Sequence, residues 1–445
     1  MELHCSSIIL LRGEEMNYKE AREYLKEISR YGSVLGLDSI KRLLKTMGNP
    51  EKKLKVVHVA GTNGKGSTCA FLQSILMEAG YKVGRYSSPA VFDDREIIRI
   101  NDEYIKKDEI ADIITWIKEK CDYIVNCGFP HPTPFEVETA MAFSYFAAKE
   151  CDIVIVECGM GGETDATNVF ERVMCSIITT ISLDHTKFLG ETIEDITKVK
   201  AGIIKEKCPV VLSEQTNGVE NIIERICIKR DAPLTISGKG QNIRRDKLVT
   251  LYCYRAGNGK QYNVTLNLLG TYQIKNSITA IEAALTLEKQ GFHVEQSIER
   301  GVKKAKWQGR LEVIHDNPYV VIDGAHNPGA VRELKSSIDL YFTNKKITFI
   351  MGVLADKDFQ TEIELIGKRA VKIITVTPDN ERALEAEKLA ETIKKYNDNV
   401  ETADDISQAV AIAFQTVCEK KADMILAFGS LSYLGDLKIA VEELL

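Results

Sequence analysis

Residues 54–80, LKVVHVAGTNGKGSTCAFLQSILMEAG, combine a short apolar run, a glycine-rich loop and a segment with helical spacing. The run 54–60 is typical of a buried strand, and the spacing after the loop predicts a helix over 68–79. One face of this helix carries Phe71, Leu72, Ile75, Leu76 and Ala79. Glycines let successive backbone N–H groups turn toward an anion, and a helix N-terminus adds positive potential. The loop therefore predicts a nucleotide-phosphate site made of Gly61, Thr62, Asn63, Gly64, Lys65, Gly66 and Ser67.

The loop departs from the common NTPase pattern GxxxxGK[ST]. Val59 stands where that pattern has its first glycine, and Gly66 rather than Ser or Thr follows Lys65. A generic NTPase is therefore disfavoured, although Lys65 still supplies positive charge for the outer phosphates.

Short apolar runs alternate with helical segments along most of the chain. In the first part the runs are DIVIVECG (152–159), SIITTIS (176–182) and PVVLS (209–213). A second array begins near Leu311 and comprises YVVIDGA (319–325), ITFIMGV (347–353), KIITVTP (372–378) and ADMILAFGS (422–430). Helical stretches separate the later runs at 328–340, 384–395 and 405–420. This alternation predicts an α/β protein with two mostly parallel sheets.

A different pattern lies between the two arrays. Residues 248–255 and 260–268 alternate apolar and polar side chains around a turn that contains Gly257 and Gly259, which predicts an antiparallel hairpin within a β insert at about 238–270. We place the boundary between the two domains near Trp307 to Arg310, giving ranges 1–309 and 310–445. Residues 1–15 fit no element well, and a helix opens at Asn17, so we expect the true start of the protein to lie near Met16.

The composition excludes several classes of protein. The 445 residues include 58 Lys and Arg against 64 Asp and Glu, a net charge of -6, so no diffuse basic surface exists for nucleic acid or an anionic membrane. Eleven scattered cysteines favour reduced thiols over a disulfide framework or a zinc site. Without a signal peptide or a long apolar run, we expect a cytoplasmic protein.

Three polar positions follow predicted strands or turns and could hold a metal. Glu157 ends the apolar run IVIVE, where a buried carboxylate needs a partner and where ligands bind in open α/β sheets. His185, after Asp184, follows the next run in the same way, and Ser88 lies in the turn YSSP. Because Mg²⁺ prefers oxygen ligands and retains waters, these positions are candidates for a magnesium site. Taken singly, Ser88 and the Asp184–His185 pair are also typical of ordinary loops.

In combination, the motifs resemble those of the folylpolyglutamate synthase and dihydrofolate synthase family, within the Mur-type ATP-dependent amide ligases. The resemblance runs from about Met16 to the C-terminus. The motifs are GTNGKGS (61–67), YSSP (86–89), VECGMGGETDATN (156–168), SLDHTKFLG (182–190), KAGIIK (200–205), LLGTYQIKN (268–276), WQGRLE (307–312), IDGAHNP (322–328) and FGSLSYLG (428–435).

The resemblance implies an ATP-binding domain and a C-terminal glutamate-binding domain of the Mur-ligase type. It implies that the loop residues listed above bind ATP phosphates and that Ser88, Glu157 and His185 hold Mg²⁺. Lys200 matches the family's carboxylated lysine (N6-carboxylysine), which bridges a second Mg²⁺. The resemblance also implies that Asn276, Arg310 and Asp323 contact the nucleotide and that domain closure completes this site. It implies that His326 is required for activity. The family's pterin site corresponds to Thr133, Pro134 and Phe135. An ordinary helix start explains the last three residues equally well.

The implied reaction transfers the γ-phosphoryl group of ATP to a carboxylate, and glutamate then attacks the acyl phosphate. The acceptor is dihydropteroate, giving dihydrofolate, or a reduced folate, giving a polyglutamate; the sequence leaves both open. We expect a monomer with only small-molecule partners. Alternatives are a muramyl-peptide ligase, disfavoured by IDGAHNP, and an ATPase without ligation. A dinucleotide-binding GxGxxG is rejected because Thr164 occupies its last glycine position.

Several positions depart from the family's usual motifs. Glu163 and Thr164 stand where relatives show Arg-Leu, Tyr272 replaces a His, Lys187 replaces an acidic residue, and Gln308 replaces a Pro. None of these changes a predicted Mg²⁺ ligand or a residue of the phosphate loop. The motifs therefore support the prediction of ligase chemistry more strongly than the prediction of the acceptor.

Overall fold

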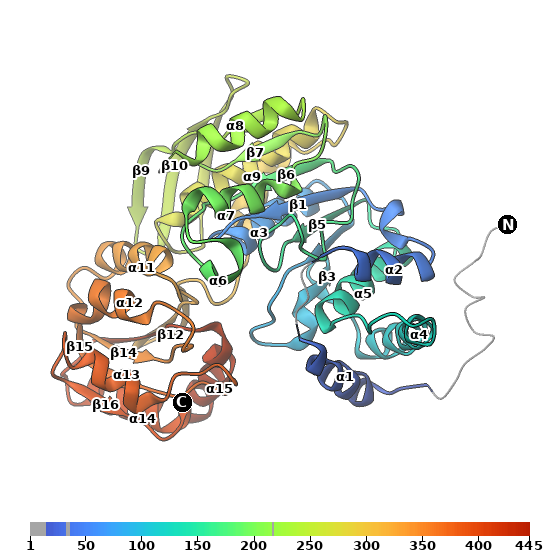
Figure 1. Ribbon diagram of the computed structural model, residues 1–445. Coiled ribbons are helices and arrows are strands. Elements are labelled where there is room, and N and C mark those ends of the chain that lie inside the picture. Colours follow the sequence, from blue (N-terminus) through green and yellow to red (C-terminus); the bar gives the residue numbers. More distant parts are fainter. Residues whose placement is uncertain (1–14, 33–35, 216–217) are drawn as a thin grey trace. The chain divides into compact units, whose positions relative to one another are not determined.

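The computed structural model describes residues 15–32, 36–215 and 218–445 (Figure 1). The described residues form two compact units. Unit 1 comprises the described residues up to Ala90, Arg95–Ser237 and Thr279–Gly301. Unit 2 comprises Val91–Asp94, Gly238–Ile278 and Val302–Leu445. The prediction that the true start lies near Met16 bears on residues 1–14, which lie outside the described ranges.

Unit 1 is built on an eight-stranded sheet with the order β4-β3-β2-β5-β1-β6-β7-β8. The strands are β1 Val56–Ala60, β2 Val83–Tyr86, β3 Ile98–Ile100, β4 Glu103–Tyr104, β5 Ile153–Glu157, β6 Cys175–Ile178, β7 Val210–Leu212 and β8 Leu234–Ile236. β2, β5, β1, β6, β7 and β8 run parallel, whereas β3 and β4 add an antiparallel edge. β1 and β5 are buried along their whole length, as expected for central parallel strands.

Helices accompany both faces of this sheet (Figure 1). Those within unit 1 are α1 Tyr18–Glu27, α2 Asp38–Thr46, α3 Lys65–Glu78, α4 Lys107–Asn126, α5 Pro134–Ala148, α6 Thr186–Leu189, α7 Ile193–Lys200 and α8 Val219–Lys229. One core joins α1, α2, α4 and α5 to side chains of β1, β2 and β5, and another joins α7 and α8 to β6 and β7. α3 packs on the central strands β1, β2 and β5. Two further helices, α9 Tyr272–Glu288 and α10 Ile298–Lys304, have residues in both units.

Unit 2 contains two sheets. The larger has the order β12-β13-β17-β14-β15-β16 and is parallel except for the β12–β13 pair. Its strands are β12 Glu312–Asp316, β13 Tyr319–Ile322, β14 Ile347–Met351, β15 Ala370–Thr375, β16 Val400–Thr402 and β17 Met424–Phe428. The smaller sheet is antiparallel and contains β9 Gln241–Asp246, β10 Val249–Arg255 and β11 Gln261–Leu266.

Helices cover both faces of the larger sheet. They are α11 Pro328–Tyr341, α12 Phe359–Ile366, α13 Ala386–Ile393, α14 Ile406–Cys418 and α15 Leu434–Leu444. One core contains side chains of α11, α12 and α13, and the other contains side chains of α14 and α15. Short 3₁₀ segments complete the two units: Ile28–Tyr31, Pro50–Lys53, Asp94–Ile97, Ala201–Ile203, Glu295–Ser297, Gly367–Arg369 and Leu431–Tyr433.

The predicted α/β class with mostly parallel sheets and a small β insert is confirmed. The hairpin 248–268 is β10 and β11, to which β9 adds a third strand. The helix after the glycine-rich loop begins at Lys65 rather than at residue 68, because its first turn consists of the loop residues themselves. The compact units group the β insert with the C-terminal sheet, and the ranges 1–309 and 310–445 stay predictions. Among the described helices, none has the length and apolar character that a membrane crossing requires.

Candidate functional site

The phosphate loop and the three predicted metal ligands follow four neighbouring parallel strands at the same edge of the sheet. Gly61 comes directly after β1, and Glu157 is the last residue of β5. Ser88 lies two residues beyond β2, and His185 follows β6. Because the carboxyl ends of parallel strands share one edge, these positions gather where open α/β sheets bind ligands.

The glycine-rich loop is fixed to the segment after β6. Thr62 N and Asn63 N donate to Thr180 O at 2.9 and 3.1 Å, and Asn63 Nδ2 donates to Ser182 Oγ at 3.2 Å. Gly61 has a φ of +152°, and a Cβ at this position would lie 1.8 Å from Thr179 Oγ1. The amides of Thr62 and Asn63 therefore bond within the protein, and the loop requires glycine at position 61.

The N-terminus of α3 completes the loop. Thr68 N donates to Gly64 O at 2.9 Å, so Lys65, Gly66 and Ser67 form the first turn of α3. This 14-residue helix begins at the carboxyl edge of the sheet, where the positive end of its dipole favours an anion. The geometry therefore suits phosphate binding at Lys65–Ser67.

Two lysines converge on one backbone carbonyl. Lys65 Nζ donates to Gly61 O at 3.2 Å and to Thr62 O at 3.4 Å. Lys200 Nζ donates to the same Gly61 O at 2.9 Å, from a side chain whose residue is only 4% exposed. Burial, followed by the positive charge of Lys65, lowers the pKa of Lys200 to about 7. Lys200 is thus a buried amine that is readily neutral, not the solvated helix residue that its sequence context suggests.

Glu157 lies within the same group of charges. Its residue is 6% exposed at the end of β5. Burial raises the pKa of the Cys69 thiol, and the Glu157 carboxylate raises it further, while Arg85 and Lys65 lower it. Burial lowers the pKa of Arg85 to about 10, and the Glu157 carboxylate acts in the opposite direction, so Glu157 lies near this cation. A carboxylate so deeply buried needs compensating positive charge, which a bound metal ion would also supply.

His185 occupies the predicted position beside Asp184. Its φ is +50°, its N–H donates to Asp184 Oδ1 at 2.8 Å, and its Nε2 lies 4.0 Å from Asp184 Oδ2. The His185 side chain is 34% exposed, which leaves part of the ring accessible at the sheet edge. Burial lowers the pKa of Lys200, and the Asp184 carboxylate acts in the opposite direction, so Asp184 lies near Lys200.

The predicted metal ligands suit a cation that retains other ligands. In the described part of the chain, no group of three or more His, Cys, Asp and Glu side chains could hold a metal on its own. Ser88, Glu157 and His185 supply one hydroxyl, one carboxylate and one imidazole. Such a partial set, which shares a sheet edge with the phosphate loop and includes a buried carboxylate, fits Mg²⁺, which commonly completes its shell with water and phosphate oxygens.

The loop after β5 packs against the end of α7. Glu163 N donates to Val199 O at 2.9 Å, and Asn168 Nδ2 donates to Glu163 O at 3.0 Å and to Gly202 O at 3.3 Å. A Cβ at Gly162 would lie 2.7 Å from Lys200 O, so the two backbones are in close contact. Glu163, which differs from the family's usual Arg, thus contributes through its backbone to the placement of Lys200.

A buried polar cluster below this loop is absent from the sequence-based prediction. His58 Nε2 lies 2.9 Å from Thr167 Oγ1 and 3.1 Å from Cys158 Sγ. Thr167 Oγ1 donates to Asp165 Oδ1 at 2.5 Å, and Asp165 Oδ2 accepts from Met160 N at 2.7 Å. Burial lowers the pKa of His58 to about 3, which keeps the ring neutral. The available signal was a histidine inside the apolar run 54–60.

Thr133, Pro134 and Phe135 open α5. Thr133 is the N-cap, because Glu136 N donates to its Oγ1 at 3.4 Å and Thr133 N donates to Glu136 Oε2 at 2.7 Å. The Phe135 ring covers Gly159, where a Cβ would lie 2.6 Å from the ring. The ordinary helix-start explanation therefore holds for Thr133 and Pro134, while Phe135 also reaches the loop that follows Glu157.

The remaining predicted residues lie in unit 2. Asp323 Oδ2 accepts from Leu311 N at 2.8 Å, Asp323 Oδ1 accepts from Ala325 N at 2.8 Å, and the nearby Arg310 guanidinium lowers the Asp323 pKa against the effect of burial. His326 Nδ1 lies 2.8 Å from Gly324 O. The structure thus groups Arg310, Asp323 and His326.

Asn276 lies in the first part of α9. Its Nδ2 donates to Gln273 Oε1 at 3.0 Å, and the residue is buried. The candidate residues therefore form one group in unit 1 and another in unit 2.

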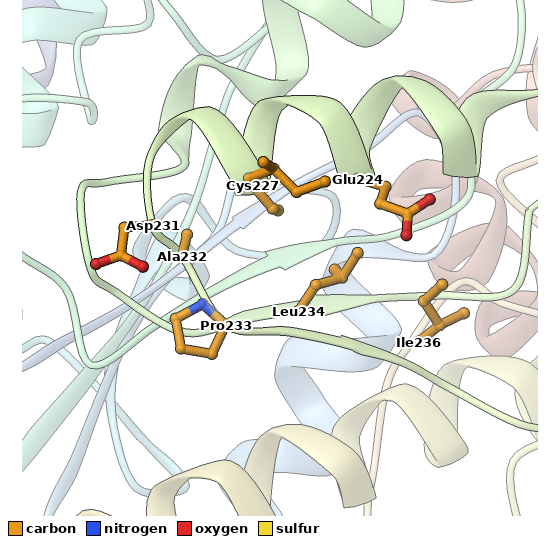
Figure 2. A pocket seen from close by; sticks show the side chains of 8 residues that line it. Glu224, Cys227, Asp231, Ala232, Pro233, Leu234 and Ile236 are labelled. Atoms are coloured by element: carbon orange, nitrogen blue, oxygen red, sulfur yellow. The ribbon is translucent and has the colours of Figure 1, made fainter.

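A separate pocket of about 510 Å³ lies between α8 and β8 (Figure 2). Figure 2 shows apolar side chains along it together with the carboxylates of Glu224 and Asp231. None of the predicted site residues lines this pocket, and its two carboxylates disfavour a phosphate ligand.

Comparison with known proteins identifies the family. The Mur ligase middle domain matches residues 59–284, and the Mur ligase glutamate ligase domain matches residues 309–431. The dihydrofolate synthase/folylpolyglutamate synthase of Bacillus subtilis is 33% identical, over 95% of this chain and 98% of the relative. The chain belongs to the folylpolyglutamate synthase and dihydrofolate synthase family. It is therefore an ATP-dependent ligase.

Solved structures of this family share the fold. Mycobacterium tuberculosis folylpolyglutamate synthase complexed with ADP aligns with a TM-score of 0.87 at 25% identity, covering 95% of this chain and 98% of that chain. An FPGS-AMPPCP-folate complex aligns with a TM-score of 0.83 at 28% identity, covering 96% and 100%. The predicted family and fold are thus confirmed, and the muramyl-peptide alternative gains no support from these relatives.

Proposed function

We propose that this ligase adds L-glutamate to a folate, to dihydropteroate, or to both, through an acyl phosphate made with ATP. The observation that carries the proposal is the convergence of Lys65 and Lys200 on Gly61 O, at the same sheet edge as the buried carboxylate of Glu157. The B. subtilis relative is named for both reactions, and a solved relative is complexed with folate and AMPPCP. The preferred acceptor stays open.

The reaction needs an activated carboxylate, because an amine cannot displace oxide from a free one. Transfer of the γ-phosphoryl group gives an acyl phosphate, from which glutamate displaces inorganic phosphate through a tetrahedral intermediate. Lys65 and the N-terminus of α3 would hold the phosphates in line with the acceptor carboxylate. Their positive charge would stabilise the transferring group as its negative charge spreads.

Ser88, Glu157 and His185 are the proposed ligands of a first Mg²⁺. When bound, this ion would neutralise charge on the transferring phosphoryl group. Lys200 is the proposed site of carboxylation, which would turn a buried amine into an anionic oxygen ligand for a second Mg²⁺. The low pKa of Lys200 supports this step, because only the neutral amine reacts with CO₂.

The other assignments stay with the family resemblance. We propose that Asn276, Arg310 and Asp323 contact the nucleotide and that His326 takes part in activity. We propose that Phe135 packs on the pterin, since its ring lies against Gly159, two residues after Glu157. Monomeric state and cytoplasmic location stay predictions.

The test is ADP release from ATP and Mg²⁺, with dihydropteroate, tetrahydrofolate or no acceptor, each with and without L-glutamate. We expect ADP release to require an acceptor, and the amide product to require glutamate. ADP release at the full rate without glutamate or acceptor would favour an ATPase. Mass spectrometry of the product distinguishes dihydrofolate from an extended polyglutamate.

A further inference from the structure

Tyr272 is the first residue of α9 and lies next to Asp323. Its hydroxyl donates to Asp323 Oδ2 at 3.0 Å, across 51 residues of sequence. Asp323 is only 3% exposed, so each of its hydrogen bonds is shielded from water. Both residues belong to unit 2, and the contact is internal to that unit.

The hydroxyl completes a set of donors around one carboxylate. Leu311 N and Tyr272 Oη both donate to Asp323 Oδ2, while Ala325 N donates to Oδ1. A carboxylate has about four acceptor positions, so these three bonds fix its orientation and leave room on Oδ1 for one more donor. A hydroxyl group of a ligand is such a donor.

The Tyr272 ring is itself held in place. Gly270 has a φ of +118°, and a Cβ there would lie 2.7 Å from the ring, so the ring lies directly over this glycine. Thr271 N donates to Ser337 Oγ at 3.0 Å, and Thr271 Oγ1 donates to Glu333 Oε2 at 3.1 Å. These bonds tie the start of α9 to α11, which gives Tyr272 a defined position relative to Asp323.

The same carboxylate adjoins Arg310. The Arg310 guanidinium and the Tyr272 hydroxyl both lower the pKa of Asp323, which burial raises. Arg310 also donates to Gly309 O at 3.0 Å and packs so closely on Gly324 that a side chain there would collide with it. A rotation of Asp323 would therefore disturb Arg310 as well.

We propose that Tyr272 is a positioning residue for nucleotide binding, because its hydroxyl holds the Asp323 carboxylate in a single orientation beside Arg310. The inference rests on the proposed roles of Asp323 and Arg310 as nucleotide contacts. Tyr272 acts through Asp323 and needs no contact with the nucleotide. Its loss weakens ATP binding without a comparable effect on the chemical step.

The test compares Tyr272→Phe with the parent enzyme. Phe keeps the ring over Gly270 and removes only the donor. We expect the KM for ATP and the Kd for ADP to rise on the order of tenfold, as for loss of a hydrogen bond to a charged group, while kcat changes by less than about twofold. Unchanged values for both nucleotides would overturn the proposal.

Tyr341→Phe is the matched control. Tyr341 Oη lies 2.6 Å from Thr250 Oγ1, so this variant also removes a tyrosine hydroxyl bond within unit 2, but one with a partner other than Asp323. We expect a similar thermal stability for the two variants and an unchanged KM for ATP in Tyr341→Phe. An equal rise in both variants would point to a general structural effect and overturn the proposal.

Asp323→Asn separates this inference from the proposed function. If Asp323→Asn weakens nucleotide binding and Tyr272→Phe added to it causes no further loss, the two residues act as a unit, as proposed. If the losses multiply, or if only Asp323→Asn has an effect, the role of Tyr272 is refuted and that of Asp323 stands. If Asp323→Asn has no effect, the proposed nucleotide contact itself fails. Should Asp323→Asn not fold, Arg310→Gln takes its place in the same cycle.

Discussion

Lys200 Nζ and Lys65 Nζ donate to the same oxygen, that of Gly61, at 2.9 and 3.2 Å. Burial lowers the pKa of Lys200, and the repulsion between two ammonium groups that share one acceptor lowers it further. An anion placed between them would relieve this repulsion. The arrangement suits either a bound phosphate or a carboxylated Lys200.

Carboxylation of Lys200 should increase as the pH rises through 7. The pKa is lowered from 10.5 to about 7, so the reactive neutral amine becomes the major form above that pH. NMR with ¹³C-labelled bicarbonate should show a carbamate signal that is stronger at pH 8 than at pH 6 and absent from Lys200→Ala. Added bicarbonate should not restore activity to Lys200→Ala. A signal of equal strength in that variant would place the modification elsewhere.

Stability should depend on pH through the same group. Between about pH 7 and 10.5 the unfolded chain keeps a proton on Lys200 that the folded chain has released, so the unfolded state binds more protons. The free energy of unfolding therefore rises with pH across this window. Urea titrations in bicarbonate-free buffer should show a shallower rise for Lys200→Met than for the parent protein.

Lys65→Ala and Glu157→Ala should each lower ligase turnover by at least about a hundredfold, because each removes charge that acts on the transferring phosphoryl group or its metal. Circular dichroism should show folded protein in both cases. Lys198→Ala is a suitable control, since Lys198 pairs on the surface with Glu194 at 2.8 Å, close in sequence to Lys200. Full turnover in either site variant would remove that residue from the proposed site.

Gly61→Ala should destabilise the protein and weaken ATP binding. The added Cβ would overlap Thr179 Oγ1, and the φ of +152° is unfavourable for alanine. We expect a loss of about 2 kcal/mol in unfolding free energy from overpacking. Two double variants test whether the overlap with Thr179 is the cause. Thr179→Ser with Gly61→Ala keeps the hydroxyl and should leave the stability as low as in Gly61→Ala alone. Thr179→Gly with Gly61→Ala removes the hydroxyl and should recover part of the lost unfolding free energy, measured by denaturant titration.

Thr133 and Phe135 should behave differently on substitution. Thr133→Ala removes a helix cap and should cost about 1 kcal/mol of stability with little change in the KM for the acceptor. Phe135→Leu keeps an apolar side chain over Gly159 but removes the aromatic face, so the KM for a pterin-containing acceptor should rise several-fold. Steady-state kinetics with varied acceptor concentration measures this KM in both variants. A rise in the KM for the acceptor that is confined to Thr133→Ala would assign the pterin contact to Thr133 rather than to Phe135.

The parts of this fold that local sequence determines were predictable. The apolar run ending at Glu157 predicts a strand, and the glycine-rich loop ending at Ser67 predicts the start of a helix; in both cases a few consecutive residues suffice. Contacts between distant segments could not be predicted in this way, because they depend on how strands and helices pack. Lys200 looks like a surface residue until α7 places it on Gly61 O. In the sequence, Tyr272 is only a replacement of the family's usual His, whereas in the structure its hydroxyl, at the start of α9, donates to Asp323.

The attachment of the glycine-rich loop to Thr180 has a thermodynamic consequence. The loop and the chain leading to His185 are joined by the amides of Thr62 and Asn63, so neither can shift without the other. Phosphate binding at one end and metal binding at the other then order the same piece of backbone, and the second ligand meets a segment already ordered by the first. Nucleotide and Mg²⁺ should each increase the affinity for the other by an equal factor, as reciprocity requires.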